Sequence, residues 1–278
     1  MGTDKWDLNF DIAGVVNSLP AMGCNVDELI DSLGKENMRE RLGRVAQKDP
    51  AICAELIYLG NTGCFGKAGA VNSIDEALGV ERIEDMAEIV AATFATRNMT
   101  TELGVIASYD QFLKHSQEIS ACMRILCGII GEDKEYSYRC ATAGLMHDAG
   151  RLVIASVTKQ ECALLVGASP EKLASIIHEE SATVGMNHCE IGRMLMRKWG
   201  FDSDLQMAVG RHHTPLIEND LNRLGGLIFV SHFVSVSDFT GGILAKSLPG
   251  QLLKGIGIDG KGFDQVKTIY QSRALAPV

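Results

Sequence analysis

The sequence lacks any long hydrophobic run, since no stretch reaches the ~18 consecutive apolar residues that a membrane-spanning helix needs. Residues 1–10 carry charges and have no apolar core of the kind that signal peptides contain. No basic run occurs and the net charge is -9, which argues against nucleic acid as a partner. These absences predict a cytoplasmic protein with no membrane partner. Small phosphorylated ligands stay open, because they need only a local positive site or a metal.

Cysteine pairs with metal-binding spacing are also missing. None of the eight cysteines forms a C-x-x-C pair, so the sequence gives little support to a zinc ribbon. Most lie among apolar residues of helical segments, where a free cysteine behaves as a small hydrophobic side chain. We interpret them as reduced core thiols in a reducing compartment. They are Cys24, Cys53, Cys64, Cys122, Cys127, Cys140, Cys162 and Cys189.

Strand signals are scarce, because alternation of apolar and polar residues rarely lasts more than a few positions. Helical signals dominate the front part of the 278 residues. Asp49-Pro50 has the pattern of an N-cap followed by a first-turn proline, and Ser73-Ile74-Asp75-Glu76 has the spacing of a capping box. Residues 97–107 are the candidate boundary. The sequence therefore predicts a helical subdomain over 1–100 and a helical bundle over 101–278.

The back part contains helices whose apolar faces include histidine. A long helix over about 108–130 places His115 on its inward stripe. Asn187 to Glu190 resembles another cap and puts His188 in the first turn of a helix. Ser203 is expected to cap the next helix, where Leu205, Val209 and His212 share a face. The segment 220–238 is expected to be helical, with Leu224, Ile228, His232 and Val236 on one face.

The segment Gly144-Leu145-Met146-His147-Asp148-Ala149-Gly150-Arg151 is the centre of the functional prediction. Adjacent His and Asp side chains can offer nitrogen and oxygen to one cation, and the carboxylate of Asp can bridge two. His178 lies in a polar stretch and is expected at the surface. The other six histidines fall at helix ends or on apolar faces, where each alone is more often a hydrogen-bonded structural residue. Together they indicate a metal site: His115, His147, His188, His212, His213 and His232.

Histidine nitrogens with carboxylate oxygens suit iron, manganese, nickel, zinc or magnesium, with one or two ions per chain. Thiolate ligands are not implied, although Cys189 adjoins His188. Two metals about 3.5–4 Å apart could clamp both sides of an in-line displacement at phosphorus. Arg151 would offer a fork of donors to a phosphate, or would be a solvent-exposed arginine at a helix start.

These motifs, in this order, resemble the HDOD family, the bacterial signalling branch of the HD metal-dependent phosphohydrolase superfamily. The resemblance covers about residues 12–240. Its specific elements are Lys114-His115-Ser116, the segment 144–151, His188-Cys189-Glu190-Ile191-Gly192, Trp199 and His212-His213. It implies an all-α fold in which a front helical subdomain packs on an HD-like bundle.

The resemblance also implies metal ligands. The superfamily uses a first His, the His-Asp pair and a later Asp, which correspond to His115, His147 and Asp148 here. Where the later Asp belongs, this chain has Val230-Ser231-His232, so His232 is a candidate ligand; Asp238 is a poor substitute. His188 and His212-His213 are similar to extra histidines of the HD-GYP branch. The D-G-x-G-Y-P signature of that branch is absent, so cyclic di-GMP hydrolysis is not implied.

Three hypotheses follow. The favoured one is a signalling module that holds metal at these His and Asp residues without turnover. In the second, the protein is a metal-dependent phosphohydrolase, in which Asp148 and the histidines hold metal and Arg151 steadies a nucleotide or other phosphate ester. The third is a metal-free scaffold for protein interactions. The expected partner is a small phosphorylated ligand or a signalling protein, and the oligomeric state is open.

Overall fold

Helices account for nearly all the regular structure of the chain. The computed structural model describes residues 11–18, 24–48, 50–66, 71, 73–103, 109–158, 170–198, 201–234 and 240–274. Over these residues the regular elements are helices, apart from one short antiparallel hairpin, so the predicted all-α fold is confirmed. The front helices are α2 (Cys24–Ser32), α3 (Met38–Lys48), α4 (Pro50–Asn61), α5 (Ile74–Leu78) and α6 (Ile83–Leu103).

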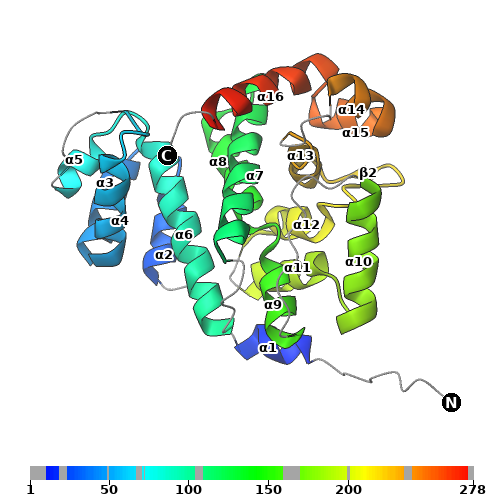
Figure 1. Cartoon of the computed structure of the whole chain (residues 1–278), viewed down its shortest axis with the longest axis horizontal. Coiled ribbons are helices and arrows are strands. Elements are labelled where there is room, and N and C mark those ends of the chain that lie inside the picture. The colour runs from blue at the N-terminus through cyan, green and yellow to red at the C-terminus, as the bar shows by residue number, and fades with distance from the viewer. Residues whose placement is uncertain are drawn as a thin grey trace.

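The back of the molecule is a larger bundle, which lies on the right of Figure 1. Helices α7 and α8 form its most extensive contact, and α16 crosses above them. Its helices are α7 (Tyr109–Ile130), α8 (Lys134–Met146), α9 (Ala149–Thr158), α10 (Pro170–Val184), α11 (His188–Lys198), α12 (Ser203–Arg211), α13 (Arg223–Ser231), α14 (Gly241–Ser247), α15 (Gly250–Ile256) and α16 (Gly260–Ala274). The hairpin pairs β1 (Leu216–Ile217) with β2 (Asp220–Leu221).

The front helices enclose a hydrophobic core of their own. Leu42, Ile52 and Leu56 are fully buried in it, as the helical spacing of apolar residues requires. Pro50 begins α4 as predicted, whereas Asp49 lies outside the described residues. Ser73 caps α5, because its side chain accepts a hydrogen bond from the Glu76 backbone nitrogen at 3.2 Å. The local sequence therefore sets where these helices begin.

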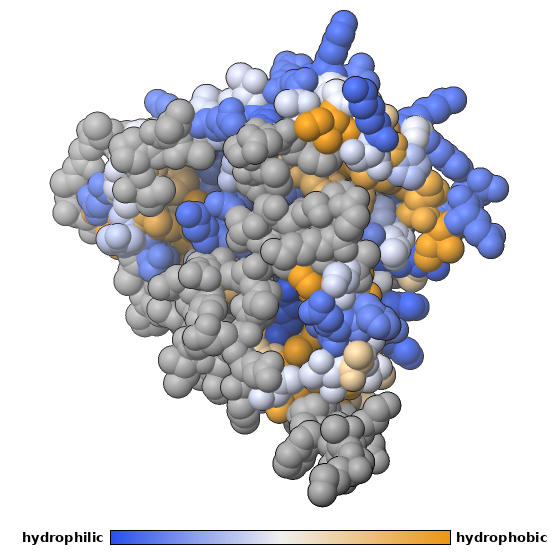
Figure 2. All heavy atoms as spheres, turned by 45° about the vertical axis from the view of Figure 1, so that its right-hand side comes forward, coloured by the Kyte–Doolittle hydropathy of each residue, from blue (hydrophilic) through white to orange (hydrophobic). Residues whose placement is uncertain are grey.

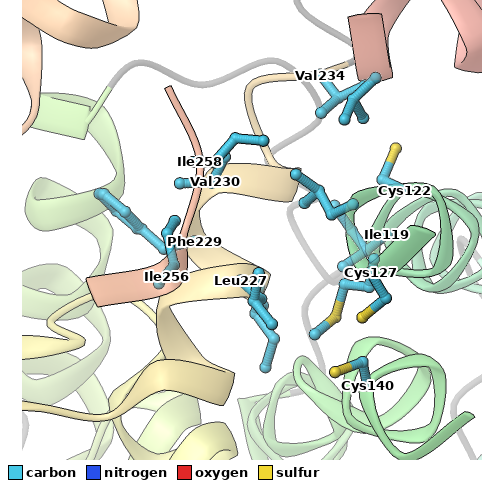
Figure 3. Close-up of a cluster of buried hydrophobic side chains, with 14 of the residues drawn as sticks. Ile119, Cys122, Cys127, Cys140, Leu227, Phe229, Val230, Val234, Ile256 and Ile258 are labelled. Atoms are coloured by element: carbon cyan, nitrogen blue, oxygen red, sulfur yellow. The ribbon is translucent and has the colours of Figure 1, made fainter. Parts of the chain in front are cut away.

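The bundle has two hydrophobic clusters. One is built mainly from α7, α8, α12, α13 and the C-terminal helices, and Figure 3 shows side chains of Ile119, Leu227 and Phe229 within it. The other joins α9 and α11 to the short helix α1 (Ile12–Ser18), which contributes Ile12 and Val16. Helix α1 thus belongs to the bundle core, and α6 extends past position 100 to Leu103. The division of the chain at residue 100 stays a prediction.

Two predicted helix starts were wrong. Helix α12 is capped by Asp202 rather than Ser203, because Asp202 Oδ1 accepts from the backbone nitrogens of Asp204 and Leu205 at 3.0 and 3.1 Å. The segment 220–238 begins with β2, and Asn222 then caps α13, which ends at Ser231. His232 is the C-cap residue of that helix. Val236 and Asp238 lie outside the described residues.

A buried carboxylate joins the front helices to the bundle. Glu88 of α6 is 6% exposed and accepts hydrogen bonds from Arg124, at 2.8 Å, and from Ser120, both on α7. Burial raises the pKa of Glu88 from 4.5 to about 7, although Arg124 opposes this change. The contact between α6 and α7 therefore contains a group that titrates near neutral pH.

We expect the Glu88→Gln variant to remove a pH dependence of stability between pH 4.5 and 7. The folded state holds the Glu88 proton more tightly than the unfolded state, so wild-type stability should fall as pH rises through this range. The difference in unfolding free energy between the wild type and the variant should change by on the order of 3 kcal/mol across this pH range. Urea unfolding at several pH values measures it. Parallel pH profiles for the two proteins would contradict the prediction.

The described surface is mixed in polarity. On the face in Figure 2, hydrophilic side chains project between separate apolar areas. The large apolar side chains that are most exposed lie on three different elements and are Tyr58, Ile217 and Ile243. Among the described helices, none combines the length and the hydropathy that crossing a membrane requires. The cysteines that the structure describes as free are Cys53, Cys64, Cys122, Cys127, Cys140 and Cys189, and their reduced state stays a prediction.

Candidate metal centre

The His-Asp pair occupies the joint between two helices. Helix α8 ends at Met146, His147 is its C-cap residue, and α9 begins at Ala149. His147 is 0% exposed and Asp148 is 1% exposed. Helices α7, α11, α12 and α13 bring the other histidines to this joint, in the middle of the bundle (Figure 1). The six predicted histidines are therefore gathered around Asp148, and all of them are buried.

A close contact between α9 and α11 places His188 beside Asp148. A Cβ atom at Gly150 would lie 2.1 Å from the carbonyl oxygen of His188 and 2.8 Å from the nitrogen of Gly192. Both atoms belong to a helix backbone, which cannot move aside as a flexible side chain can. Glycine at position 150 is thus required for the approach of the two helices.

The Gly150→Ala variant should lose about 3 kcal/mol or more of unfolding free energy, because overpacking against backbone is costly. Gly128→Ala is the matched control, since a Cβ there meets nothing within 4 Å. That control lies within α7 and should gain about 0.5–1 kcal/mol. Denaturant unfolding of both variants measures the effects. Equal stabilities for the two variants would show that the α9–α11 contact is not tight.

The first histidine group consists of His115, His147 and His232. Nδ1 of His147 lies 2.7 Å from the carbonyl oxygen of Gly144, and Nδ1 of His232 lies 2.9 Å from that of Ile228. A carbonyl oxygen only accepts, so each Nδ1 carries the proton and each Nε2 keeps its lone pair. Nε2 of His115 and Nε2 of His147 have no hydrogen-bond partner in the described structure. They lie 3.7 and 3.5 Å from Asp148 Oδ2.

The second group consists of His188, His212 and His213. Nε2 of His188 is 3.0 Å from Nε2 of His213 and 3.3 Å from Nε2 of His212. Nδ1 of His212 donates to the carbonyl oxygen of Val209 at 2.7 Å, so Nε2 is the ring nitrogen that faces the cluster. Oδ1 of Asp148 lies 3.3 Å from His188 Nε2 and 3.7 Å from His212 Nε2. One carboxylate oxygen therefore faces each histidine group.

This arrangement fits a divalent cation in either group. Nitrogens that bind one metal at about 2.0–2.1 Å lie about 3.0–3.4 Å from each other, depending on geometry. The observed Nε2–Nε2 distances of 3.0 and 3.3 Å fall in this range. The donor atoms of His115, His147 and His232 lie within 4.8 Å of one another, as do those of His147, Asp148 and His212. A cation would also satisfy the buried Nε2 atoms that lack partners.

The protonation of most of these groups suits metal binding. Burial lowers the pKa of His115 to about 4, and it holds the pKa values of His147, His213 and His232 well below the usual range. Burial alone would raise the pKa of Asp148, but Arg151 and the histidines hold it well below its usual value. Neutral imidazole and ionised carboxylate are the forms that bind metals.

Cys189 was not expected in this cluster, and it lies within it. Its Sγ is 3.5 Å from Nε2 of His188 and 3.7 Å from Nδ1 of His212. Burial opposes ionisation of the thiol, but His188 and His212 lower its pKa to about 6. Burial likewise opposes a charge on His212, but Cys189 and Asp148 raise its pKa to about 10. The group of His188, His212 and His213 therefore offers a cation a sulfur atom as well as nitrogen atoms.

Glu180 of α10 is a second residue that the sequence did not single out. Its Oε2 accepts from the His188 Nδ1 at 2.5 Å and from the His188 backbone nitrogen at 2.9 Å. This leaves His188 Nε2 directed at the cluster, as the outer partners of metal-bound histidines do. Its position eight residues before His188 carried no sequence signal. The nearby His178 is exposed, as predicted.

Arg151 is buried rather than solvent-exposed. It is 3% exposed, with Nε 3.0 Å from Asp148 Oδ1 and a terminal nitrogen 3.9 Å from Glu180 Oε1. Its guanidinium thus balances the carboxylate at the centre of the cluster. The predicted contact of Arg151 with a phosphate stays a prediction.

Comparison with known proteins identifies the family. The sequence pattern of the HDOD domain matches residues 19–215. The chain belongs to the HDOD family. An HDOD domain protein of unknown function from Geobacter sulfurreducens has the same fold, with a TM-score of 0.67, 15% identity and 94% of each chain covered. The HDOD resemblance and the HD-like helical fold expected from the sequence are therefore confirmed.

Two further solved structures share the HDOD fold. A candidate phosphohydrolase from Shewanella amazonensis SB2B has a TM-score of 0.62, 17% identity and 94% coverage of each chain. A candidate signal transduction protein from Marinobacter aquaeolei VT8 has a TM-score of 0.63 and 16% identity, over 95% of this chain and 63% of that one. None of the curated proteins matches the chain. At these identities the likeness establishes the fold.

Proposed function

We propose that this HDOD protein is a bacterial signalling module that holds one or two divalent metal ions in its histidine cluster and does not turn over a substrate. The observation that carries the proposal is the burial of the whole cluster. The side chains of Asp148 and of the six histidines around it range from 0% exposed for His147, His188 and His212 to 8% for His213. Such a site can hold a metal but gives a phosphate ester little access to it. Output would pass to a signalling protein or a small phosphorylated ligand.

The donor set favours transition metals. In the cluster of Asp148 and its neighbouring histidines, imidazole nitrogens outnumber carboxylate oxygens. Imidazole suits iron, nickel and zinc, whereas magnesium prefers oxygen ligands. Manganese remains compatible with the mixed donors of Asp148 and its neighbours. His232 stands where the superfamily pattern has a later Asp, which lowers the negative charge of the cluster by one unit.

Hydrolysis of a phosphate ester is the second candidate function. It is favoured by Asp148, whose two oxygens face different histidine groups, as in sites that hold two metals. A bound metal there would activate water and neutralise charge on a phosphoryl group. Arg151, however, already pairs with Asp148, so this candidate requires Arg151 to exchange its partner for the substrate.

Elemental analysis of purified protein tests the proposal. We expect about one or two iron, manganese, nickel or zinc atoms per chain in the wild type and a clearly lower metal content in His147→Ala. His178→Ala is the matched control, because His178 is an exposed histidine outside the cluster and the variant should keep its metal. If the protein stays metal-free after reconstitution, the metal-binding proposal fails and the scaffold hypothesis remains. Hydrolysis of nucleotides or bis(p-nitrophenyl) phosphate that is lost in His147→Ala would favour the enzyme.

A further inference from the structure

The environment of Cys189 differs from that of the other buried cysteines. Cys122, Cys127 and Cys140 lie in a hydrophobic cluster among apolar side chains (Figure 3). Cys189 is also buried, but its Sγ faces imidazole nitrogens: it lies 3.5 Å from His188 Nε2 and 3.9 Å from His212 Nε2. Filling space in an apolar core therefore does not account for this thiol.

The distances around His188 match a tetrahedral site. Zinc binds nitrogen at about 2.0–2.1 Å and thiolate sulfur at about 2.3 Å, which places nitrogens about 3.4 Å apart and sulfur about 3.6 Å from nitrogen. From His188 Nε2 the observed distances are 3.0 Å to His213 Nε2, 3.3 Å to His212 Nε2 and 3.5 Å to Cys189 Sγ. The donor atoms of all four residues lie within 4.8 Å of one another. Small shifts of these four donor atoms would allow all of them to bind one ion.

The surroundings support these ligands. Glu180 fixes the ring of His188, and the carbonyl oxygen of Val209 fixes that of His212. Cys189 stands in the first turn of α11, where the positive end of the helix dipole favours a thiolate. Asp148 Oδ1 has Arg151 at 3.0 Å, so its charge is balanced without an ion in this group.

We propose that Cys189 completes a closed zinc site with His188, His212 and His213. The inference rests on the proposed metal binding and specifies it further. Four protein ligands leave no open position for water, which is the arrangement of structural rather than catalytic zinc. The thiolate makes this site softer than the group of His115, His147, His232 and Asp148, so the two sites would select different metals. Such a zinc site would stabilise the joint between α11 and α12.

X-ray absorption spectroscopy at the zinc edge tests the assignment on the full chain loaded with one equivalent of zinc. We expect one sulfur at about 2.3 Å with three nitrogens at about 2.0–2.1 Å. Cys189→Ala should lose the sulfur shell and bind the first zinc at least about a hundredfold more weakly, because even outer partners of a metal contribute 10- to 100-fold. Cys122→Ala is the matched control and should retain both properties.

The outcomes separate this inference from the proposed function. Zinc bound by nitrogen and oxygen alone in the wild type would overturn the role of Cys189 and leave metal binding intact. A wild-type protein that binds no zinc and no other divalent metal would overturn both. The wild-type spectrum decides the question by itself, so the result does not depend on whether Cys189→Ala folds.

Discussion

The metal-free Asp148→Asn variant is expected to lose about 3–5 kcal/mol of unfolding free energy, because the change leaves a buried cation without its nearest carboxylate. Asp148 and Arg151 are 1% and 3% exposed, and Arg151 Nε lies 3.0 Å from Asp148 Oδ1. Neutralising one member of such a pair costs more than the pair contributes, since the remaining charge keeps its desolvation penalty. Urea unfolding in the presence of a chelator measures the loss.

Two controls identify burial as the cause. The double variant Asp148→Asn/Arg151→Met removes both charges and should regain most of the stability, because apolar replacement of a whole buried pair is often neutral. Asp220→Asn breaks the ion pair of Arg211 with Asp220, which is 2.7 Å long but largely exposed. This surface change should cost no more than about 1 kcal/mol. A double variant as unstable as Asp148→Asn would contradict the argument.

The helical fold and much of the cluster could be predicted because local patterns determine them. Spacing along 108–130 put His115 on the buried face of α7, and it is 4% exposed there. Asn187 caps α11 as predicted: its Oδ1 accepts from the Glu190 nitrogen, and its own nitrogen donates to Glu190, both at 3.0 Å. That cap fixes His188 at the first helical position. A local motif thus placed one candidate ligand correctly.

The parts that could not be predicted depend on contacts between distant segments. Glu180 lies in a polar stretch of sequence, and only the packing of α10 against α11 brings it to His188. Cys189 has the sequence environment of a core thiol, and its approach to His212 joins residues from two helices. Asp202 and Ser203 both suit an N-cap, and Asp202 takes the position while also pairing with Arg139 at 2.6 Å. Where two adjacent residues both suit the N-cap, tertiary contacts determine which of them occupies it.

Removing the metal is expected to lower the melting temperature of the wild type by about 8–16 °C. An ion present at about 1,000 times its dissociation constant stabilises the folded state by about 4 kcal/mol, because it binds the folded state alone. For a chain of about this size, 1 kcal/mol corresponds to a shift of about 2–4 °C. Thermal unfolding with and without a chelator, at constant pH and ionic strength, measures the difference.

Comparison of variants assigns this shift to the cluster. His178→Ala keeps the six buried histidines and should show the wild-type shift, whereas His147→Ala should show a smaller one. The shift should also shrink at acid pH, because protons compete with the metal for imidazole nitrogens. An unchanged melting temperature after complete removal of metal would mean that the histidines support one another through their backbone hydrogen bonds and packing. In that case the cluster is a structural feature of the bundle, and the scaffold hypothesis gains the support that the metal-binding proposal loses.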